Sequence, residues 1–144
     1  MKTTKGFTLI ELMVVLAIIA IVTAISTPNV IRWVNTQRFN SGVRDIHAAI
    51  EATRQRAVKE NGEGRVIFDA SNPGQFRTRV VRRAVAGVQE KVHRLPPGVT
   101  ISTTRNIVFT SRGTATSFGT ITVNGPGGQS LNIMVNITGG SQIS

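Results

Sequence analysis

The chain has 144 residues, which is material for one domain, and it contains no cysteine. The lack of cysteine excludes disulfides, thiolate metal sites and cysteine nucleophiles. Lys and Arg number 17 against 7 Asp and Glu, which gives a net charge of +10. A charge of this size favours anionic partners such as nucleic acid, acidic lipid headgroups or an acidic subunit face.

The first segment of the chain is apolar over the length of a membrane span. Between Phe7 and Ile25 the polar residues are Thr8, Glu11 and Thr23. At 1.5 Å per residue, a helix of this length roughly matches the ~30 Å hydrocarbon core of a bilayer. The segment can therefore cross a membrane as a single helix.

Two lysines, Lys2 and Lys5, precede this segment and predict its orientation. The positive-inside tendency keeps the amino end in the cytoplasm and carries everything after Pro28 across the membrane. The alternative is an ordinary secretory signal, because the small residues of Ala24–Ser26 also fit a signal cleavage site. Glu11 argues against a discarded peptide, since a carboxylate costs roughly 2.5–3.5 kcal/mol at the bilayer centre.

The stretch KGFTLIELMVVLAIIAIV, residues 5–22, resembles the class III signal of type IV pilins and type II secretion pseudopilins. This resemblance implies that a prepilin peptidase cleaves between Gly6 and Phe7 and methylates the new amino terminus. It also implies that Glu11 is an assembly residue, which meets the amino terminus of a neighbouring subunit inside the filament. Pro28 is expected to kink the helix, because proline removes a backbone donor and crowds the preceding turn.

Beyond Pro28, apolar residues recur at steps of three and four positions, which is typical of an amphipathic helix. This stripe comprises Val30, Val34, Val43, Ile46, Ile50 and Ala57, with Trp33 and Phe39 nearby. Asn61 and Gly62 predict the end of the helix. A continuous helix from Phe7 to Glu60 would be roughly 80 Å long.

After Gly64 the pattern changes to short runs rich in Val, Ile, Thr and Phe, separated by turn-forming residues. The expected strands lie within residues 65–70, 74–81, 98–103, 106–111, 119–125 and 130–139. Residues 113–119 and 124–128 are expected to be loops and a hairpin turn. They do not fit a phosphate-binding loop, which requires a following Lys and Ser or Thr at the start of a helix.

The predicted fold class is α+β: a long N-terminal helix, half transmembrane and half amphipathic, packed on a small antiparallel β-rich head. The predicted segments are a cleaved leader at 1–6, a transmembrane and filament-core helix at 7–27, an amphipathic helix at 28–61 and the head at 62–144.

The C-terminal half is similar to the GspH/FimT branch of pilin-like proteins. The similarity lies in VTISTTRNIVFTSRGTATSFGTITVN, residues 99–124, and SLNIMVNITGGSQIS, residues 130–144. That branch contains the H-type minor pseudopilin of type II secretion and the FimT-like minor pilins. Several FimT-like proteins bind DNA through an arginine-bearing tail after the last strand. The tail here, Gly139–Gln142, contains no Arg, which argues against DNA binding by that motif.

The densest basic run is RTRVVRR, residues 77–83. On a strand, alternate residues share a face, so Arg77, Arg79 and Arg83 would lie on one face and Arg82 on the other. One interpretation is an exposed edge strand that its charges protect from aggregation. The other is an anion-binding or DNA-binding surface, whose affinity would fall steeply with salt.

The sequence predicts no enzyme, cofactor or metal site, because it contains no nucleophile elbow, paired-carboxylate motif or dinucleotide fingerprint. His47 and Glu51 lie one helical turn apart, a spacing that suits a metal. The arginines around them favour a solvated helix face instead. The second histidine, His93, is expected in a loop.

The resemblance implies a minor pilin or pseudopilin, held by a single span in the bacterial inner membrane with its N-terminus cytoplasmic and its head periplasmic. It would then enter a type IV pilus or a type II secretion pseudopilus, near the tip. Expected partners are a prepilin peptidase, other pilin or pseudopilin subunits and the inner membrane before assembly. The alternatives are a DNA-binding minor pilin of natural transformation and a secreted basic adhesin whose leader is wholly removed.

Overall fold

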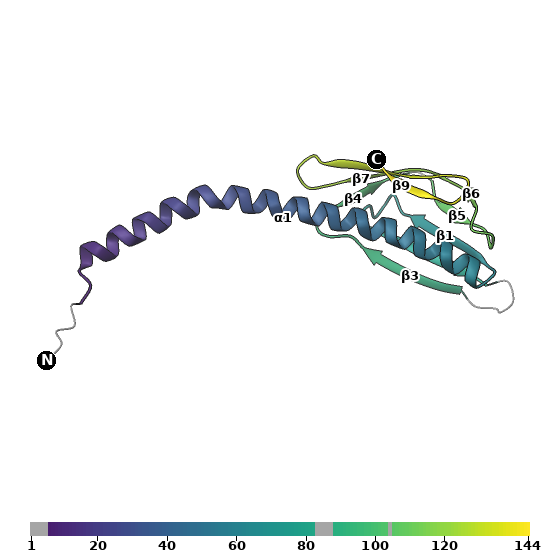
Figure 1. The fold of residues 1–144 in the computed structure, drawn as a ribbon, viewed down its shortest axis with the longest axis horizontal. Coiled ribbons are helices and arrows are strands. Elements are labelled where there is room, and N and C mark those ends of the chain that lie inside the picture. The colour runs from purple at the N-terminus through teal and green to yellow at the C-terminus, as the bar shows by residue number, and fades with distance from the viewer. Residues whose placement is uncertain (1–5, 83–87, 104) are drawn as a thin grey trace. The chain divides into compact units, whose positions relative to one another are not determined.

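The computed structural model describes residues 6–82, 88–103 and 105–144, with the backbone alone for residues 25–28 (Figure 1). The chain forms two compact units, Met1–Val34 and Asn35–Ser144. One helix, α1 (Leu9–Lys59), supplies the described secondary structure of the first unit and the first element of the second. The expected kink at Pro28 falls within residues 25–28, whose side chains lie outside the described part, and it stays a prediction.

Both ends of α1 follow from local sequence. At the start, the Glu11 N–H donates to Thr8 Oγ1 at 3.3 Å, so Thr8 caps a helix that has Glu at its third position. At the end, Asn61 takes a left-handed φ of 45°, and the Gly62 N–H donates to the Ala57 carbonyl at 2.9 Å. The helix is therefore slightly shorter at each end than the expected Phe7–Glu60.

The head contains two antiparallel sheets. The first has the strand order β3-β2-β1-β5-β6, and the second has the order β4-β7-β8-β9. The strands are β1 (Glu63–Phe68), β2 (Gln75–Val81), β3 (Val88–Arg94), β4 (Thr100–Ser102), β5 (Ile107–Phe109), β6 (Ala115–Ser117), β7 (Gly119–Asn124), β8 (Ser130–Val135) and β9 (Ser141–Ile143). The α+β fold predicted from the sequence is confirmed.

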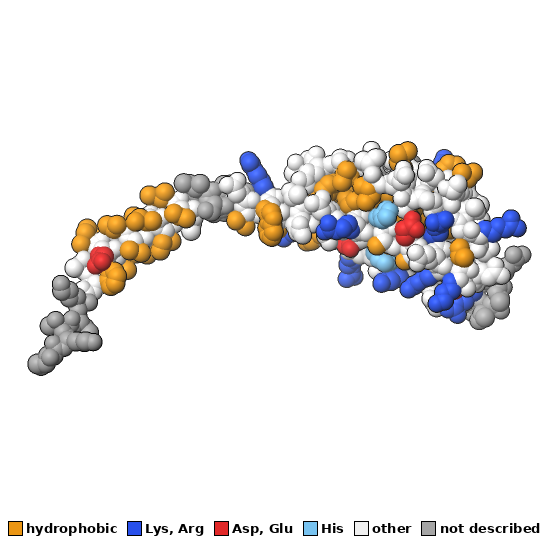
Figure 2. All heavy atoms as spheres, viewed as in Figure 1, with side chains coloured by type: hydrophobic (Ala, Val, Ile, Leu, Met, Phe, Trp, Pro, Cys, Tyr) orange, Lys and Arg blue, Asp and Glu red, His pale blue; other side chains and the backbone are white. Residues whose placement is uncertain are grey.

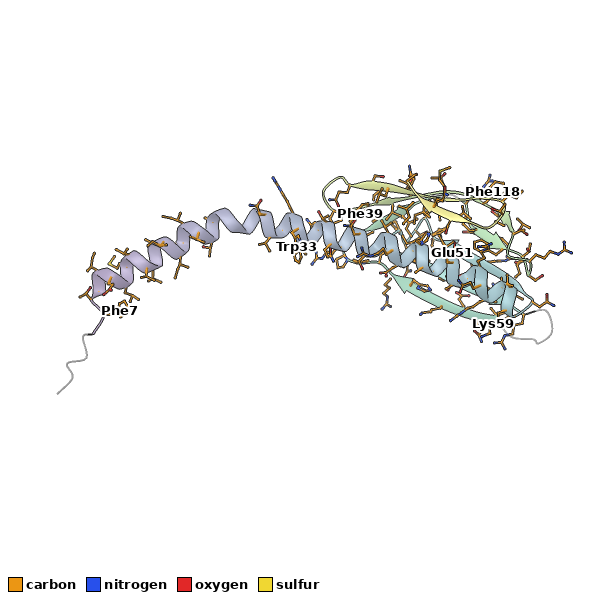
Figure 3. All side chains as sticks on the ribbon, in the orientation of Figure 1. Phe7, Trp33, Phe39, Glu51, Lys59 and Phe118 are labelled. Atoms are coloured by element: carbon orange, nitrogen blue, oxygen red, sulfur yellow. The ribbon has the colours of Figure 1, made fainter. Side chains whose placement is uncertain are left out.

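The core of the head lies between the second half of α1 and the inner faces of both sheets. Its largest fully buried side chains are Phe76, Phe109, Ile46, Ile50, Ile107, Ile121 and Ile133. Two glycines allow close approach to α1. A Cβ on Gly64 in β1 would lie 2.9 Å from the Thr53 carbonyl oxygen, and a Cβ on Gly125 would lie 2.6 Å from the ring of Phe39, labelled in Figure 3.

Three strands were not predicted from the sequence, and a fourth has a different place in its sheet. The strand β3 was not expected, and the prediction that His93 lies in a loop is wrong, because His93 pairs with Phe76 inside this ladder. The strand β6 replaces part of the loop expected at 113–119, and β9 follows the last predicted strand. The strand β2 is interior rather than an edge, since β3 covers it. The expected hairpin turn at 124–128 joins β7 to β8.

We expect Ile50→Ala to lower the free energy of unfolding of the head by about 2–5 kcal/mol, because Ile50 is fully buried and its truncation leaves a cavity. Ile137→Ala is the matched control. Ile137 is 62% exposed, so the same change there should stay within about 0.5 kcal/mol. Denaturant unfolding of the full chain in detergent micelles measures both values. Equal losses in the two variants would contradict the described core.

Candidate assembly segment and polar surfaces of the head

The first unit presents a continuous apolar surface. Every large apolar side chain from Phe7 to Val22 is at least 42% exposed, and these side chains cover this part of α1 in Figure 2. An 18-residue window of the helix has a mean hydropathy of 2.7 and is not buried at all by the described residues. The helix is long and apolar enough to cross a membrane, and its surface requires an apolar environment.

The predicted processing and assembly residues lie together at the start of this surface. Gly6 and Phe7 are exposed and non-helical, directly before α1, so the peptide bond between them lies outside the helix. Glu11 is exposed in the first turn, where the helix dipole favours a negative charge. Thr8 fixes this turn through its bond to the Glu11 N–H. The carboxylate is therefore held within one turn of the helix end.

The arginines of the predicted basic run, residues 77–83, do not form one cluster. Arg77 and Arg79 share the outer face of β2, while the alternate residues Thr78 and Val80 point into the core. Arg77 Nη1 lies 3.4 Å from Glu90 Oε1 on β3, and Glu90 is also the direct cross-strand neighbour of Arg79. Arg83 lies outside the described residues.

Arg82 is directed to the end of α1, where its Nε donates to Glu60 Oε2 at 2.8 Å. This hydrogen bond lowers the pKa of the Glu60 carboxyl despite the opposing effect of desolvation, and it raises the pKa of Arg82. Both groups therefore stay charged over the physiological range. The structure thus brings Arg77 and Arg79 together and separates them from Arg82.

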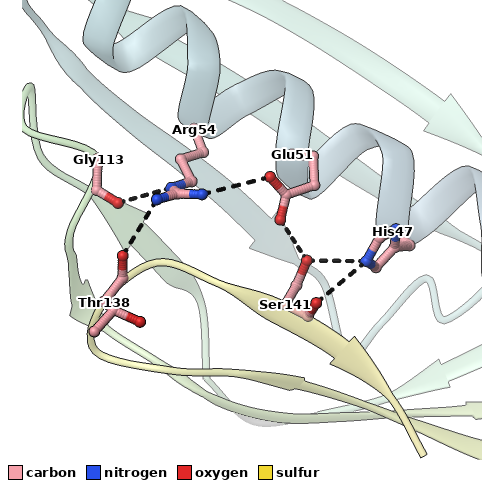
Figure 4. Close-up of polar contacts among 6 residues, drawn as sticks. All are labelled: His47, Glu51, Arg54, Gly113, Thr138 and Ser141. Carbon is pink, nitrogen blue, oxygen red and sulfur yellow. Dashed lines mark hydrogen bonds and ion pairs between the residues drawn. The ribbon is translucent and has the colours of Figure 1, made fainter.

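A polar network joins α1 to the C-terminal strand (Figure 4). Ser141 Oγ lies 2.6 Å from Glu51 Oε1 and 3.0 Å from His47 Nε2. Arg54 Nη1 lies 3.7 Å from Glu51 Oε2, and Arg54 Nε donates to the Gly113 carbonyl at 2.9 Å. The prediction of a solvated helix face around His47 and Glu51 is wrong, because these side chains are half-buried against β9 and its preceding turn.

The hydrogen bonds of this network are those of a structural contact and differ from those of a catalytic serine. The Ser141 hydroxyl donates its hydrogen to Glu51, so His47 Nε2 is the donor in its contact with Ser141. A serine nucleophile requires the opposite arrangement, in which the imidazole accepts the hydroxyl proton. Within the described ranges, no group of three or more His, Asp and Glu side chains could hold a metal ion.

A second polar contact, beneath β3, has no signal in the sequence. His93 Nε2 lies 3.0 Å from Thr78 Oγ1, and its ring stacks on Phe76 with centroids 4.8 Å apart. Burial lowers the pKa of His93, and the nearby positive charges of Lys91 and Arg56 lower it further. The folded protein therefore favours a neutral imidazole at this position.

Two family models match the chain. The prokaryotic N-terminal methylation motif matches residues 1–27, and the type II transport protein GspH model matches residues 42–139. The chain belongs to the GspH family. The predicted prepilin signal and the predicted GspH/FimT branch are both confirmed. No curated protein matches the chain significantly.

Solved structures with the same fold come from both pili and secretion systems. The type IV minor pilin FimU of Pseudomonas aeruginosa is 13% identical, with a TM-score of 0.62, over 78% of this chain and 92% of the FimU chain. The minor pseudopilin EpsH of the Vibrio cholerae type 2 secretion system is 11% identical, with a TM-score of 0.59, over 74% of this chain and 96% of the EpsH chain. At these low sequence identities, the structural similarity establishes the fold alone.

Membership of the GspH family indicates the general role of each of the two units. The family consists of structural pilin and pseudopilin subunits, and the methylation motif implies processing by a prepilin peptidase and assembly with other pilin subunits. The apolar part of α1 indicates membrane anchoring. The hydrogen bonds that join Glu51 to the C-terminal strand and Arg54 to the carbonyls of Gly113 and Thr138 stabilise the head.

We expect the head to lose stability as the pH falls below about 6.5, the unfolded pKa of histidine. The folded pKa of His93 is lower, so the unfolded chain takes up the proton first. The contribution of His93 is fully present above the unfolded pKa and is lost as the pH falls toward the folded pKa. Asp45 opposes this effect, whereas Lys91 and Arg56 reinforce it.

Unfolding free energies of the wild type and His93→Gln, measured from about pH 7.5 to pH 5.5, test this expectation. The variant should show a shallower loss of stability on acidification, because it lacks the group that titrates. An identical pH slope in the two proteins would show that His93 does not carry the effect.

Proposed function

We propose that the chain is a minor pilin or pseudopilin, a structural subunit that is anchored in the inner membrane and later enters a filament near its tip. The observation that supports this most strongly is the uncovered apolar surface of residues 7–22, with one carboxylate in its first turn. A bilayer can cover such a surface before assembly, and the helices of other subunits can cover it afterwards. The head has a core of its own and needs neither.

The proposed processing uses the non-helical residues that precede α1. A prepilin peptidase removes residues 1–6 by cleaving between Gly6 and Phe7, and methylates the amino group of Phe7. Lys2 and Lys5 hold the amino end in the cytoplasm, so the head lies in the periplasm. In the mature chain, residues 7–27 form the membrane and filament-core segment, residues 28–61 the amphipathic part of the helix and residues 62–144 the β-rich head.

The proposed role of Glu11 follows from the cost of its charge. A carboxylate in the hydrocarbon core is destabilised by roughly 2.5–3.5 kcal/mol, and an opposite charge on a neighbouring subunit relieves that cost. In the filament this partner is the amino terminus of a neighbouring Phe7. Because a helix that is shifted along its neighbour leaves the carboxylate unpaired, Glu11 also sets the register of packing.

A DNA-binding minor pilin is the second candidate. It is favoured by the positions of Arg65, Arg77 and Arg79, which share the outer face of the first sheet. Two carboxylates weaken that face as a phosphate-binding surface, because Arg65 pairs with Glu63 and Arg77 pairs with Glu90. The contacts therefore favour a solvated, charge-balanced face over a nucleic-acid interface.

We expect Glu11→Ala to insert into the membrane normally, because the helix becomes more apolar, and to be reduced in filaments. Glu11→Gln separates the charge from the helix cap, since an amide still fits the capping position but carries no charge. Both variants should lose incorporation, measured by co-purification with the filament partners after mechanical shearing. Normal incorporation of Glu11→Gln alongside failure of Glu11→Ala would assign Glu11 to capping and refute the proposed charge pairing.

A further inference from the structure

The strand β3 ends its sheet with an open backbone edge. The sheet order places β2 on one side of β3, and no described strand lies on the other. Leu95 donates to the Gly74 carbonyl at 2.9 Å, which fixes the alternation of hydrogen-bonded positions along the β2–β3 ladder. By that alternation, the N–H and C=O groups of Val88, Glu90 and Val92 face away from β2.

A basic groove lies directly beneath this edge. It has a volume of about 490 Å³ and lies between the side of α1 and the inner faces of β2 and β3. Arg56 on α1 and Lys91 on β3 line it, and neither forms an ion pair with a described carboxylate. Glu90 also lines the groove, but its carboxylate pairs with Arg77. The hydroxyl of Thr78 and the ring of His93 form part of its wall. Lys and Arg side chains gather along this side of the head in Figure 2.

The opposite face of the same edge carries two exposed valines, with Glu90 between them. Val88 and Val92 are 50% and 52% exposed, and they project from the outer face of β3, whereas Lys91 and His93 project into the groove. The edge thus presents two exposed valines on its outer face and the cationic side chains of Lys91 and Arg56 on its groove face. This difference between the two faces suits an added strand, whose successive side chains also point in opposite directions.

We propose that the edge of β3 binds an extended segment of a partner protein, which adds to the first sheet as a further strand and alternates acidic with apolar side chains. The acidic side chains enter the groove beside Lys91 and Arg56. The apolar side chains cover Val88 and Val92. Backbone hydrogen bonds supply affinity in this mode of recognition, and the alternating side chains supply specificity.

The backbone of the edge favours a polypeptide over a nucleic acid. Each outward-facing residue of β3 presents an N–H donor and a C=O acceptor, and another strand satisfies both. A phosphate offers acceptors alone, so it would leave the carbonyls facing negative charge. The site is lined by residues of α1, β2 and β3 and is independent of the assembly role proposed for Glu11.

The probe for this site is a labelled peptide of alternating glutamate and valine with blocked ends. Its control is the same peptide with lysine in place of glutamate. We expect fluorescence anisotropy to show binding of the glutamate peptide to the full-length protein in detergent micelles, and at least tenfold weaker binding of the lysine peptide. Equal affinities for the two peptides, or no binding of either, would overturn the proposal.

Hydrogen exchange locates the bound peptide. The amides of Glu90 and Val92 face the open edge and should become protected when the glutamate peptide binds. The amides of Gln89 and Lys91 already donate within the β2–β3 ladder and serve as the internal reference. Binding without new protection at Glu90 and Val92 would show that the peptide does not extend the sheet.

Charge reversal tests the groove. The double variant Arg56→Glu with Lys91→Glu should weaken binding of the glutamate peptide at least tenfold. The control, Lys59→Glu with Arg112→Glu, makes the same change of net charge at side chains that line a different hollow on α1, and should bind as the wild type does. Equal losses in both variants would indicate a general charge effect and refute the site. Duplex DNA that bound at this groove in place of the peptide would refute it in favour of a nucleic-acid interface.

Discussion

The constraint on which the rest of the molecule depends is the uncovered apolar surface at the start of α1. Burial of apolar surface is worth about 25 cal/mol per Å², so a helix that exposes every large side chain from Phe7 to Val22 is unstable in water. A membrane relieves this cost, as does a bundle of similar helices. In the proposed function Glu11 distinguishes the two environments, because lipid would offer its carboxylate no partner and a bundle of processed subunits would offer an amino terminus.

The second half of α1 buries its apolar side chains within the head instead of exposing them. Its apolar stripe, which includes Ile46 and Ile50, packs between two sheets, and its polar side chains are tied to distant parts of the chain. Glu51 holds Ser141 on the last strand, and Glu60 holds Arg82 beyond β2. Glu51, which the sequence alone places on a solvated helix face, and Glu60 therefore stabilise the head through these contacts. Among the described residues, Arg56 and Lys91 make no such ion pair, and they line the groove beneath an open strand edge.

Sequence patterns predicted those elements whose signal is local. The helix stop at Asn61 and Gly62 follows from backbone geometry, and the alternating strands follow from burial on one face. The strand β3 was missed because it is exposed over almost its whole length and so has no apolar alternation. The contacts of His47 and Arg82 depend on partners that the fold brings together, and no spacing in the sequence encodes them. The prepilin signal was identified because its residues are contiguous.

The most direct test of the account is the mass of the native protein, combined with its sedimentation. We predict a mature chain that begins at N-methylated Phe7, retains the apolar helix, and sediments with sheared filaments. A native chain that begins near residue 27 and remains in solution as a monomer would contradict it, because the apolar surface on which the proposed assembly depends would then be absent from the finished molecule.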